Sequence, residues 1–315
     1  MMRGKLITSA IAVLFVLGAH PTQTAAQNRP ATTFKAGVDL VRVAAVVRDH
    51  KGRFVRDLTA GDFEVLDSGA PRRIADFRSD ISGISVALLF DVSGSMEGQL
   101  PRAREAASHV LSWLDASADE AAVFTFDTRL EEAAPFTRGL TTLPDRMSNV
   151  VPFGETSLHD AIAETAKREG DREGRRRAVV VLTDGGDNAS RLRPADVSAA
   201  ASAIDVPVYI VGIVPSIDNP SADVATASAS HSALAGPLAD LAERTGGHVF
   251  VASTPSERSQ AARQIVDELR HQYLIAFESS GQPGWHPLEV RARRKDLIVR
   301  ARSGYLAGQS SLDAY

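Results

Sequence analysis

An apolar strand that ends in oxygen-bearing side chains is the stretch that most constrains this chain. Residues 86–90, VALLF, have the composition of a buried strand. Asp91, Ser93 and Ser95 follow at alternate positions, and Gly94 allows a tight turn between the serines. Open α/β sheets bind ligands at the carboxyl ends of their strands, so we expect a site there. Carboxylate and hydroxyl oxygens suit a hard cation such as Mg²⁺.

Strands and helices alternate between residues 84 and 270. After the opening strand, apolar runs predict strands at residues 121–126, 178–182, 206–211 and 249–251. Apolar residues at helical spacing predict helices at 100–114, 158–166, 194–204, 234–242 and 255–270. Thr254 and Glu257 form a capping box before the last of these helices. This alternation predicts an α/β fold with a doubly wound, mostly parallel sheet.

Two loops interrupt the alternation. Residues 168–177, REGDREGRRR, are most simply a solvated turn, with an anion-binding role as the alternative. Residues 216–233 are small and polar and show no periodicity, which is typical of a long functional or mobile loop.

The α/β region is flanked by segments with strand patterns, at residues 34–80 and 272–305, and residues 306–315 form a tail. Neither segment alone buries much, so we expect the two to pack together as a small β-sandwich-like domain that the α/β domain interrupts. One face of its last strands carries the arginines Arg291, Arg293, Arg300 and Arg302. We interpret this face as solvated; a binding patch for anionic surfaces is the alternative.

The amino terminus has the layout of a secretory signal peptide. Arg3 and Lys5 precede an apolar run at residues 6–17, and small residues lead to Ala26, after which we expect cleavage. The predicted signal peptide therefore covers residues 1–26, and an uncleaved anchor is the alternative. No other stretch approaches the roughly 20 apolar residues of a membrane span. We expect a secreted or periplasmic protein without a transmembrane span in its mature form.

Two further oxygen groups fall where additional cation ligands are needed. Thr156 stands just before a predicted helix, and Asp184 follows the strand predicted at residues 178–182. Strand ends of a parallel sheet share one edge, so both can converge on Asp91. Two carboxylates neutralise one divalent cation, while the neutral hydroxyls leave it able to accept a carboxylate from a partner. Such a site is better suited to binding an acidic residue than to chemistry.

Several other functional classes lack support in the sequence. The net charge of −4 gives no indication of a nucleic-acid partner, and the absence of cysteine excludes thiol and thiolate chemistry. Neither Ser93 nor Ser95 lies in a G-x-S-x-G nucleophile elbow. A phosphatase using Asp91 as nucleophile would need an acid two residues later, where Ser93 stands. We therefore expect no enzymatic activity.

Asp91-Val92-Ser93-Gly94-Ser95, Thr156 and Thr183-Asp184-Gly185 together resemble the metal-ion-dependent adhesion site of von Willebrand factor type A domains, over roughly residues 84–270. The flanks resemble a bacterial secreted branch described as VWFA-related proteins of acidobacteria. The resemblance implies that Asp91, Ser93, Ser95, Thr156 and Asp184 hold Mg²⁺, with Mn²⁺ or Ca²⁺ as alternatives. It also implies that the helix at residues 255–270 shifts when a ligand binds.

We expect a cation-dependent adhesion module whose ion docks an Asp or Glu of a protein partner. The alternative is a structural or assembly component of the cell envelope that binds through its β domain. Only two residues separate the helix at 255–270 from the strand at 273–277, so a helix shift could reach the β domain.

Overall fold

The computed structural model describes residues 40–80, 83–172, 174–203, 205–215 and 234–307. The expected signal peptide and the loop at residues 216–233 lie outside the described residues. Within the described part of the chain, no helix is long and apolar enough to cross a membrane.

A six-stranded sheet forms the centre of the α/β region. Its strands lie in the order β10-β9-β8-β5-β6-β7, and every neighbouring pair is parallel except β6 and β7. Their bounds are β5 Ile84–Asp91, β6 Glu120–Phe126, β7 Leu130–Arg138, β8 Arg176–Thr183, β9 Val208–Gly212 and β10 Val249–Val251. All eight residues of β5 are buried, because helices cover both faces of the sheet. The predicted fold class is confirmed.

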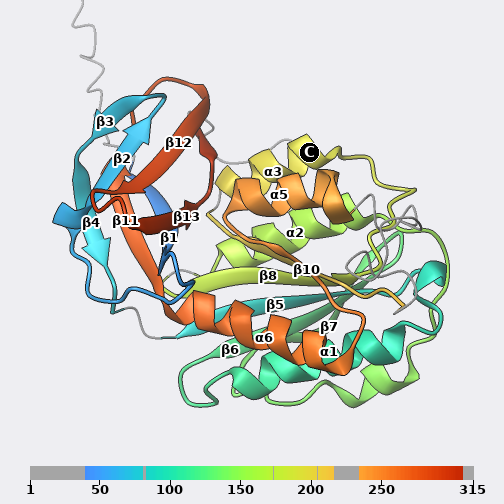
Figure 1. Cartoon of the computed structure of the whole chain (residues 1–315). Coiled ribbons are helices and arrows are strands. Elements are labelled where there is room, and N and C mark those ends of the chain that lie inside the picture. The colour runs from blue at the N-terminus through green and yellow to red at the C-terminus, as the bar shows by residue number, and fades with distance from the viewer. Residues whose placement is uncertain (1–39, 81–82, 173, 204, 216–233, 308–315) are drawn as a thin grey trace, which may run out of the picture. The chain divides into compact units, whose positions relative to one another are not determined.

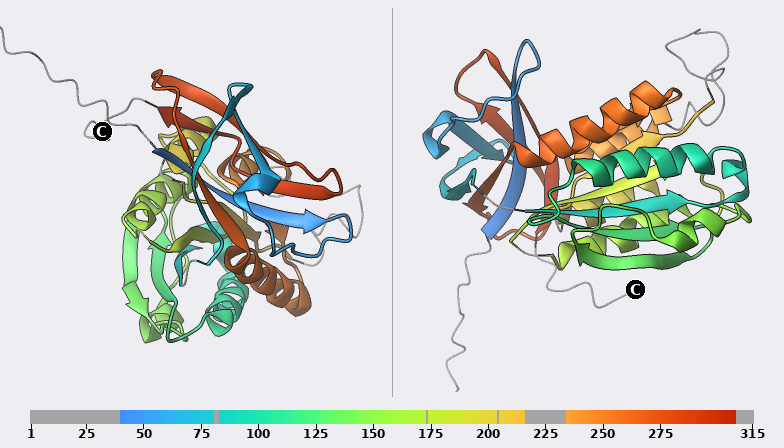
Figure 2. Two further views of the ribbon diagram at one scale, coloured as in Figure 1. Left: turned by 90° about the vertical axis from the view of Figure 1, so that its left-hand side faces the viewer. Right: turned by 90° about the horizontal axis from the view of Figure 1, so that it is seen from below.

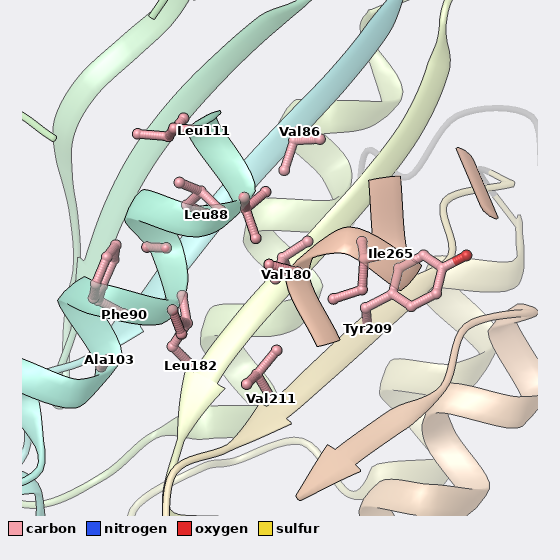
Figure 3. Packing of buried hydrophobic residues seen from close by; sticks show 14 of the residues in the cluster. Val86, Leu88, Phe90, Ala103, Leu111, Val180, Leu182, Tyr209, Val211 and Ile265 are labelled. Atoms are coloured by element: carbon pink, nitrogen blue, oxygen red, sulfur yellow. The ribbon is translucent and has the colours of Figure 1, made fainter. Parts of the chain in front are cut away.

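Helices lie on both sides of this sheet (Figures 1 and 2). One face packs against α1 (Leu100–Trp113) and α6 (Pro255–Arg270), and the other against α2 (Leu158–Gly170), α3 (Pro194–Ala203) and α5 (Pro237–Thr245). Figure 3 shows the core on the side of α1 and α6, where apolar side chains from β5, β8 and β9 meet Leu111 and Ile265. This packing holds the strand ends in fixed positions.

The predicted capping box at the start of α6 is confirmed. The Thr254 hydroxyl accepts a hydrogen bond from the Glu257 backbone N–H at 3.3 Å, and the Glu257 carboxylate accepts one from the Thr254 N–H at 2.9 Å. These bonds satisfy N–H groups that have no partner within the helix.

The flanking segments form two antiparallel four-stranded sheets, in the orders β13-β1-β11-β4 and β14-β12-β2-β3. Their strands are β1 Leu40–Asp49, β2 Phe63–Asp67, β3 Ala70–Arg72, β4 Ile74–Arg78, β11 Gln272–Glu278, β12 Gly284–Ala292, β13 Leu297–Ala301 and β14 Gly304–Ala307. Phe63, Tyr273 and Phe277 are buried in one shared core. Strands from before and after the α/β region therefore build this β domain together.

The interpretation of the arginine-bearing face as solvated is wrong for two of its four residues. Arg302 is buried, lies 3.5 Å from the carboxylate of Asp205 and donates to a backbone carbonyl of β1. Arg300 forms an ion pair with Glu268 of α6. Arg291 and Arg293 are exposed.

The carboxyl group of Glu169 is buried at the end of α2, and burial raises its pKa to about 8, although the positive charge of Arg177 opposes the shift. Between pH 4.5, the ordinary pKa, and about pH 8, Glu169 therefore keeps its proton in the folded state, whereas the unfolded chain releases it. The free energy of unfolding should fall as the pH rises through this window. We expect Glu169→Gln to remove this loss. At pH 8 its free energy of unfolding should exceed that of the wild type by on the order of a few kcal/mol.

Urea denaturation at pH 5 and pH 8 measures this difference. Glu164→Gln is the matched control, because Glu164 is exposed on the same helix. An identical pH dependence in Glu169→Gln and the wild type would show that Glu169 titrates normally.

Candidate metal site

Asp91 ends β5 as a fully buried carboxylate with both oxygens held in place. Its Oδ1 accepts hydrogen bonds from the Ser93 backbone N–H at 3.0 Å and from the Ser93 hydroxyl at 2.6 Å. Its Oδ2 accepts one from the Thr183 hydroxyl at 2.6 Å, across the pair of neighbouring strands β5 and β8. The side chain is thereby fixed at the carboxyl edge of the sheet.

Ser93 is the N-cap of a short 3₁₀ turn, Gly94–Met96, and Ser95 lies within that turn. Their Oγ atoms are 3.2 Å apart. Neighbouring ligands of an octahedral Mg²⁺ with bonds of about 2.1 Å are about 3.0 Å apart. Both hydroxyls can therefore coordinate one ion after a small adjustment.

The segment that contains Thr156 packs against this turn. Gly94 donates its N–H to the Gly154 carbonyl at 3.0 Å, and a Cβ at Gly94 would lie 3.4 Å from that oxygen. Gly154 itself has a φ of +82°, which favours glycine. Thr156 is buried, and its backbone N–H donates to Oδ1 of Asn188 at 2.8 Å. The positive φ of Gly154 thus shapes the segment that bonds to the turn, and Asn188 ties Thr156 to the loop after β8.

Asp184 follows β8 and accepts a hydrogen bond from the Gly186 N–H at 3.0 Å. Burial raises the pKa of Asp91 to about 6, hydrogen bonds from Ser93 and Thr183 oppose this shift, and the negative charge of Asp184 adds to it. Two carboxylates at one buried edge repel each other, so a cation between them would favour their ionised forms.

The structure brings the segments of all five predicted ligands to the same edge of the sheet. Their donor set is two carboxylates, Asp91 and Asp184, and three hydroxyls, those of Ser93, Ser95 and Thr156. Among the described residues, no group of three or more His, Cys, Asp or Glu side chains could hold a metal ion. A cation at this edge would therefore depend on the hydroxyls, and a hard divalent ion fits such oxygens.

The supporting roles of several residues around the site were not predicted from the sequence. Thr183 orients Asp91, and Asn188 holds Thr156. In the sequence, Thr183 looks like an ordinary strand residue and Asn188 like an ordinary turn residue. His159 lies 2.7 Å from the Asp187 carboxylate, which also accepts the Ser190 hydroxyl at 2.6 Å. Burial disfavours ionisation of Asp187, but the hydrogen bonds from His159 and Ser190 lower its pKa to about 2. The hydrogen bonds among His159, Asp187 and Ser190 therefore stabilise the loop that follows β8.

Comparison with known proteins gives one family match. The model of the von Willebrand factor type A domain matches residues 85–266, which is more than half of the chain and includes all five candidate ligands. No curated protein matches the chain.

Solved structures of low sequence identity also match. An aerotolerance-related membrane protein from Bacteroides fragilis is 18% identical, with 59% of this chain and 98% of that chain covered and a TM-score of 0.49. A von Willebrand factor type A protein from Catenulispora acidiphila is 15% identical, covering 88% and 76%, with a TM-score of 0.47. Proximal thread matrix protein 1 from the mussel byssus, with a zinc-occupied MIDAS motif, is 20% identical, covering 64% and 49%, with a TM-score of 0.45.

Proposed function

Because the chain belongs to the von Willebrand factor type A family, we propose that it is a divalent-cation-dependent protein-binding module. Domains of this family are generally protein-interaction modules. Asp91, Ser93, Ser95, Thr156 and Asp184 would hold the ion, for which we favour Mg²⁺. An Asp or Glu side chain of a partner protein would complete its coordination.

The observation that supports this proposal best is the group of two carboxylates and three hydroxyls in segments that meet at one edge of the sheet. Its two carboxylates match the charge of one divalent cation, and the three hydroxyls add no further negative charge. A bound ion would therefore remain attractive to an external carboxylate. Thr183 and the Ser93 N–H orient Asp91, so the protein supplies a preformed arrangement.

We also propose that the protein acts outside the cytoplasm, as a secreted or periplasmic molecule. The support is the charged, apolar and small-residue layout of residues 1–26. Interaction with envelope or extracellular proteins would follow from that location.

Partner capture from envelope extract tests the proposed function. We expect the immobilised wild type to retain one or more proteins in Mg²⁺ and to release them in EDTA. Asp91→Ala should retain at least tenfold less of the same proteins in Mg²⁺, because the site loses a charged ligand. Glu164→Gln, with its substitution on the exposed side of α2, serves as the matched control.

The outcome also separates the alternatives. Capture that survives both EDTA and Asp91→Ala would favour an envelope structural or assembly component that binds through its β domain. Turnover of a phosphoester panel that disappears in Asp91→Ala would instead indicate an enzyme.

A further inference from the structure

The loop beside the candidate metal site exposes two large apolar side chains. Val151 is 79% exposed and Phe153 is 80% exposed. Other large apolar residues in the described part of the chain are less exposed, namely Leu40, Trp113, Leu192, Trp285 and Ile298. The two most exposed ones thus stand two residues apart.

The backbone of this loop is fixed rather than loose. Arg104 of α1 donates to the Val150 carbonyl at 3.1 Å, and the Phe153 N–H donates to the Val92 carbonyl at 2.9 Å. The next carbonyl, that of Gly154, accepts the Gly94 N–H at 3.0 Å. Pro152 further restricts the conformation of the segment. Phe153 is therefore held outward by bonds to the turn that carries the candidate serine ligands.

A rigid, exposed aromatic side chain suits a binding contact. Ordering a preformed loop costs little on association, and a covered phenylalanine removes a large apolar area from water. Aromatic residues are also enriched among the residues that dominate binding energy.

The charges around the loop indicate what kind of partner would cover it. Glu97 and Glu155 are exposed beside the candidate ligands, whereas Arg104, which bonds to the Val150 carbonyl, is only partly exposed. They repel an anionic lipid surface and also an acidic peptide, unless a cation at the site attracts the peptide's carboxylate. The loop bonds directly to the carbonyl of Val92 and to the N–H of Gly94, which flank Ser93. An extended peptide advances about 3.3 Å per residue, so a residue one or two positions from that carboxylate can reach the loop.

We propose that Phe153, with Val151, is an apolar specificity contact of this site. The segment that binds at this site belongs to a partner protein and contains an Asp or Glu. A large apolar residue lies within two positions of that acid, on either side. This inference rests on the proposed cation-dependent docking and adds the second half of the recognised motif.

An array of synthetic decapeptides tests the inference with the full chain as the soluble probe. Each peptide has a Gly-Ser background with one Asp or none, and with Leu or Ser at one neighbouring position. In Mg²⁺ we expect wild type to bind the Asp-Leu peptides at least tenfold more strongly than the Asp-Ser peptides, and EDTA to abolish the binding.

Phe153→Ser should lose this tenfold preference but keep binding that requires Asp and Mg²⁺. It should also keep the wild-type affinity for Mg²⁺, because the Phe153 side chain is 80% exposed and the bond from Phe153 to the Val92 carbonyl is made by the backbone. Ile298→Ser is the matched control, as it removes an exposed apolar side chain from β13. It should behave as the wild type.

Two failures can be told apart. Binding that requires Asp but has no apolar preference would overturn the role of Phe153 and leave the proposed function intact. Binding without any Asp requirement, or none at all, would contradict both. Mg²⁺-dependent sedimentation with phosphatidylcholine–phosphatidylglycerol vesicles that Phe153→Ser abolishes would replace the peptide with a membrane as occupant.

Discussion

Replacing Asp91 by asparagine is expected to lower the affinity for Mg²⁺ or Mn²⁺ about a hundredfold while the chain stays folded. The substitution removes one of two negative charges that would balance the ion, but it preserves the size of a fully buried side chain. The metal-free variant should be at least as stable as the wild type. Burial raises the pKa of Asp91 to about 6, so the wild type holds an unfavourable buried charge at neutral pH.

Calorimetric titration with Mg²⁺, or paramagnetic resonance with Mn²⁺, gives the affinity, and thermal unfolding in EDTA gives the stability. Glu97→Gln is the matched control, because Glu97 is an exposed acid on the same turn that is not a proposed ligand. We expect its affinity to stay within a few fold of the wild type. Unchanged metal binding in Asp91→Asn would exclude Asp91 from the site.

Replacing Glu268 by alanine is expected to destabilise the folded chain by about 3 kcal/mol. Glu268 is fully buried near the end of α6 and pairs with Arg48 of β1 at 3.0 Å and with Arg300 of β13. Its loss leaves two largely covered guanidinium groups without their carboxylate partner. The penalty of an uncompensated buried charge exceeds the value of an exposed ion pair.

Chemical denaturation measures this loss, and Glu289→Ala is its control. Glu289 pairs with Arg291 at 2.5 Å, but both side chains are about half exposed, so we expect little change. Equal stability of Glu268→Ala and the wild type would mean that the pairs with Arg48 and Arg300 contribute nothing. The same contact joins α6 to the β domain, and transmission of a helix shift along it stays a prediction.

The architecture of the α/β region could be predicted because its apolar patterns are strong. The eight residues of β5 are buried on both faces, and the apolar run at residues 178–182 forms most of β8. By contrast, the edge strand β7 was missed. Its sequence LEEAAPFTR is partly exposed, contains a proline and pairs with β6 through irregular register, all of which weaken a strand pattern.

Four candidate ligands could be proposed from the sequence because they lie at or just after strand ends, and Thr156 because it precedes a helix, but the supporting roles of their neighbours could not. Thr183 is a typical strand residue, and its hydrogen bond to Asp91 depends on the pairing of β5 with β8. Asn188 lies 32 residues from Thr156 and meets it only in the folded chain. The sequence contains no local pattern for such contacts.

The arginines of the last strands show a different limit. Alternation correctly separates the two faces of a strand, but it does not show what covers each face. Arg300 and Arg302 lie on the face that we interpreted as solvated, yet they meet Glu268 and Asp205 of the α/β region. Long-range packing therefore decided the environment of these side chains.

The most direct test of the proposed cation site is X-ray diffraction from crystals grown with Mn²⁺, measured at a wavelength where manganese scatters anomalously. We predict one strong anomalous peak in contact with the hydroxyls of Ser93, Ser95 and Thr156, at the edge that carries Asp91 and Asp184. The peak should vanish in crystals of Asp91→Asn grown under the same conditions. Well-ordered density at this edge without an anomalous peak, at a saturating Mn²⁺ concentration, would contradict the assignment.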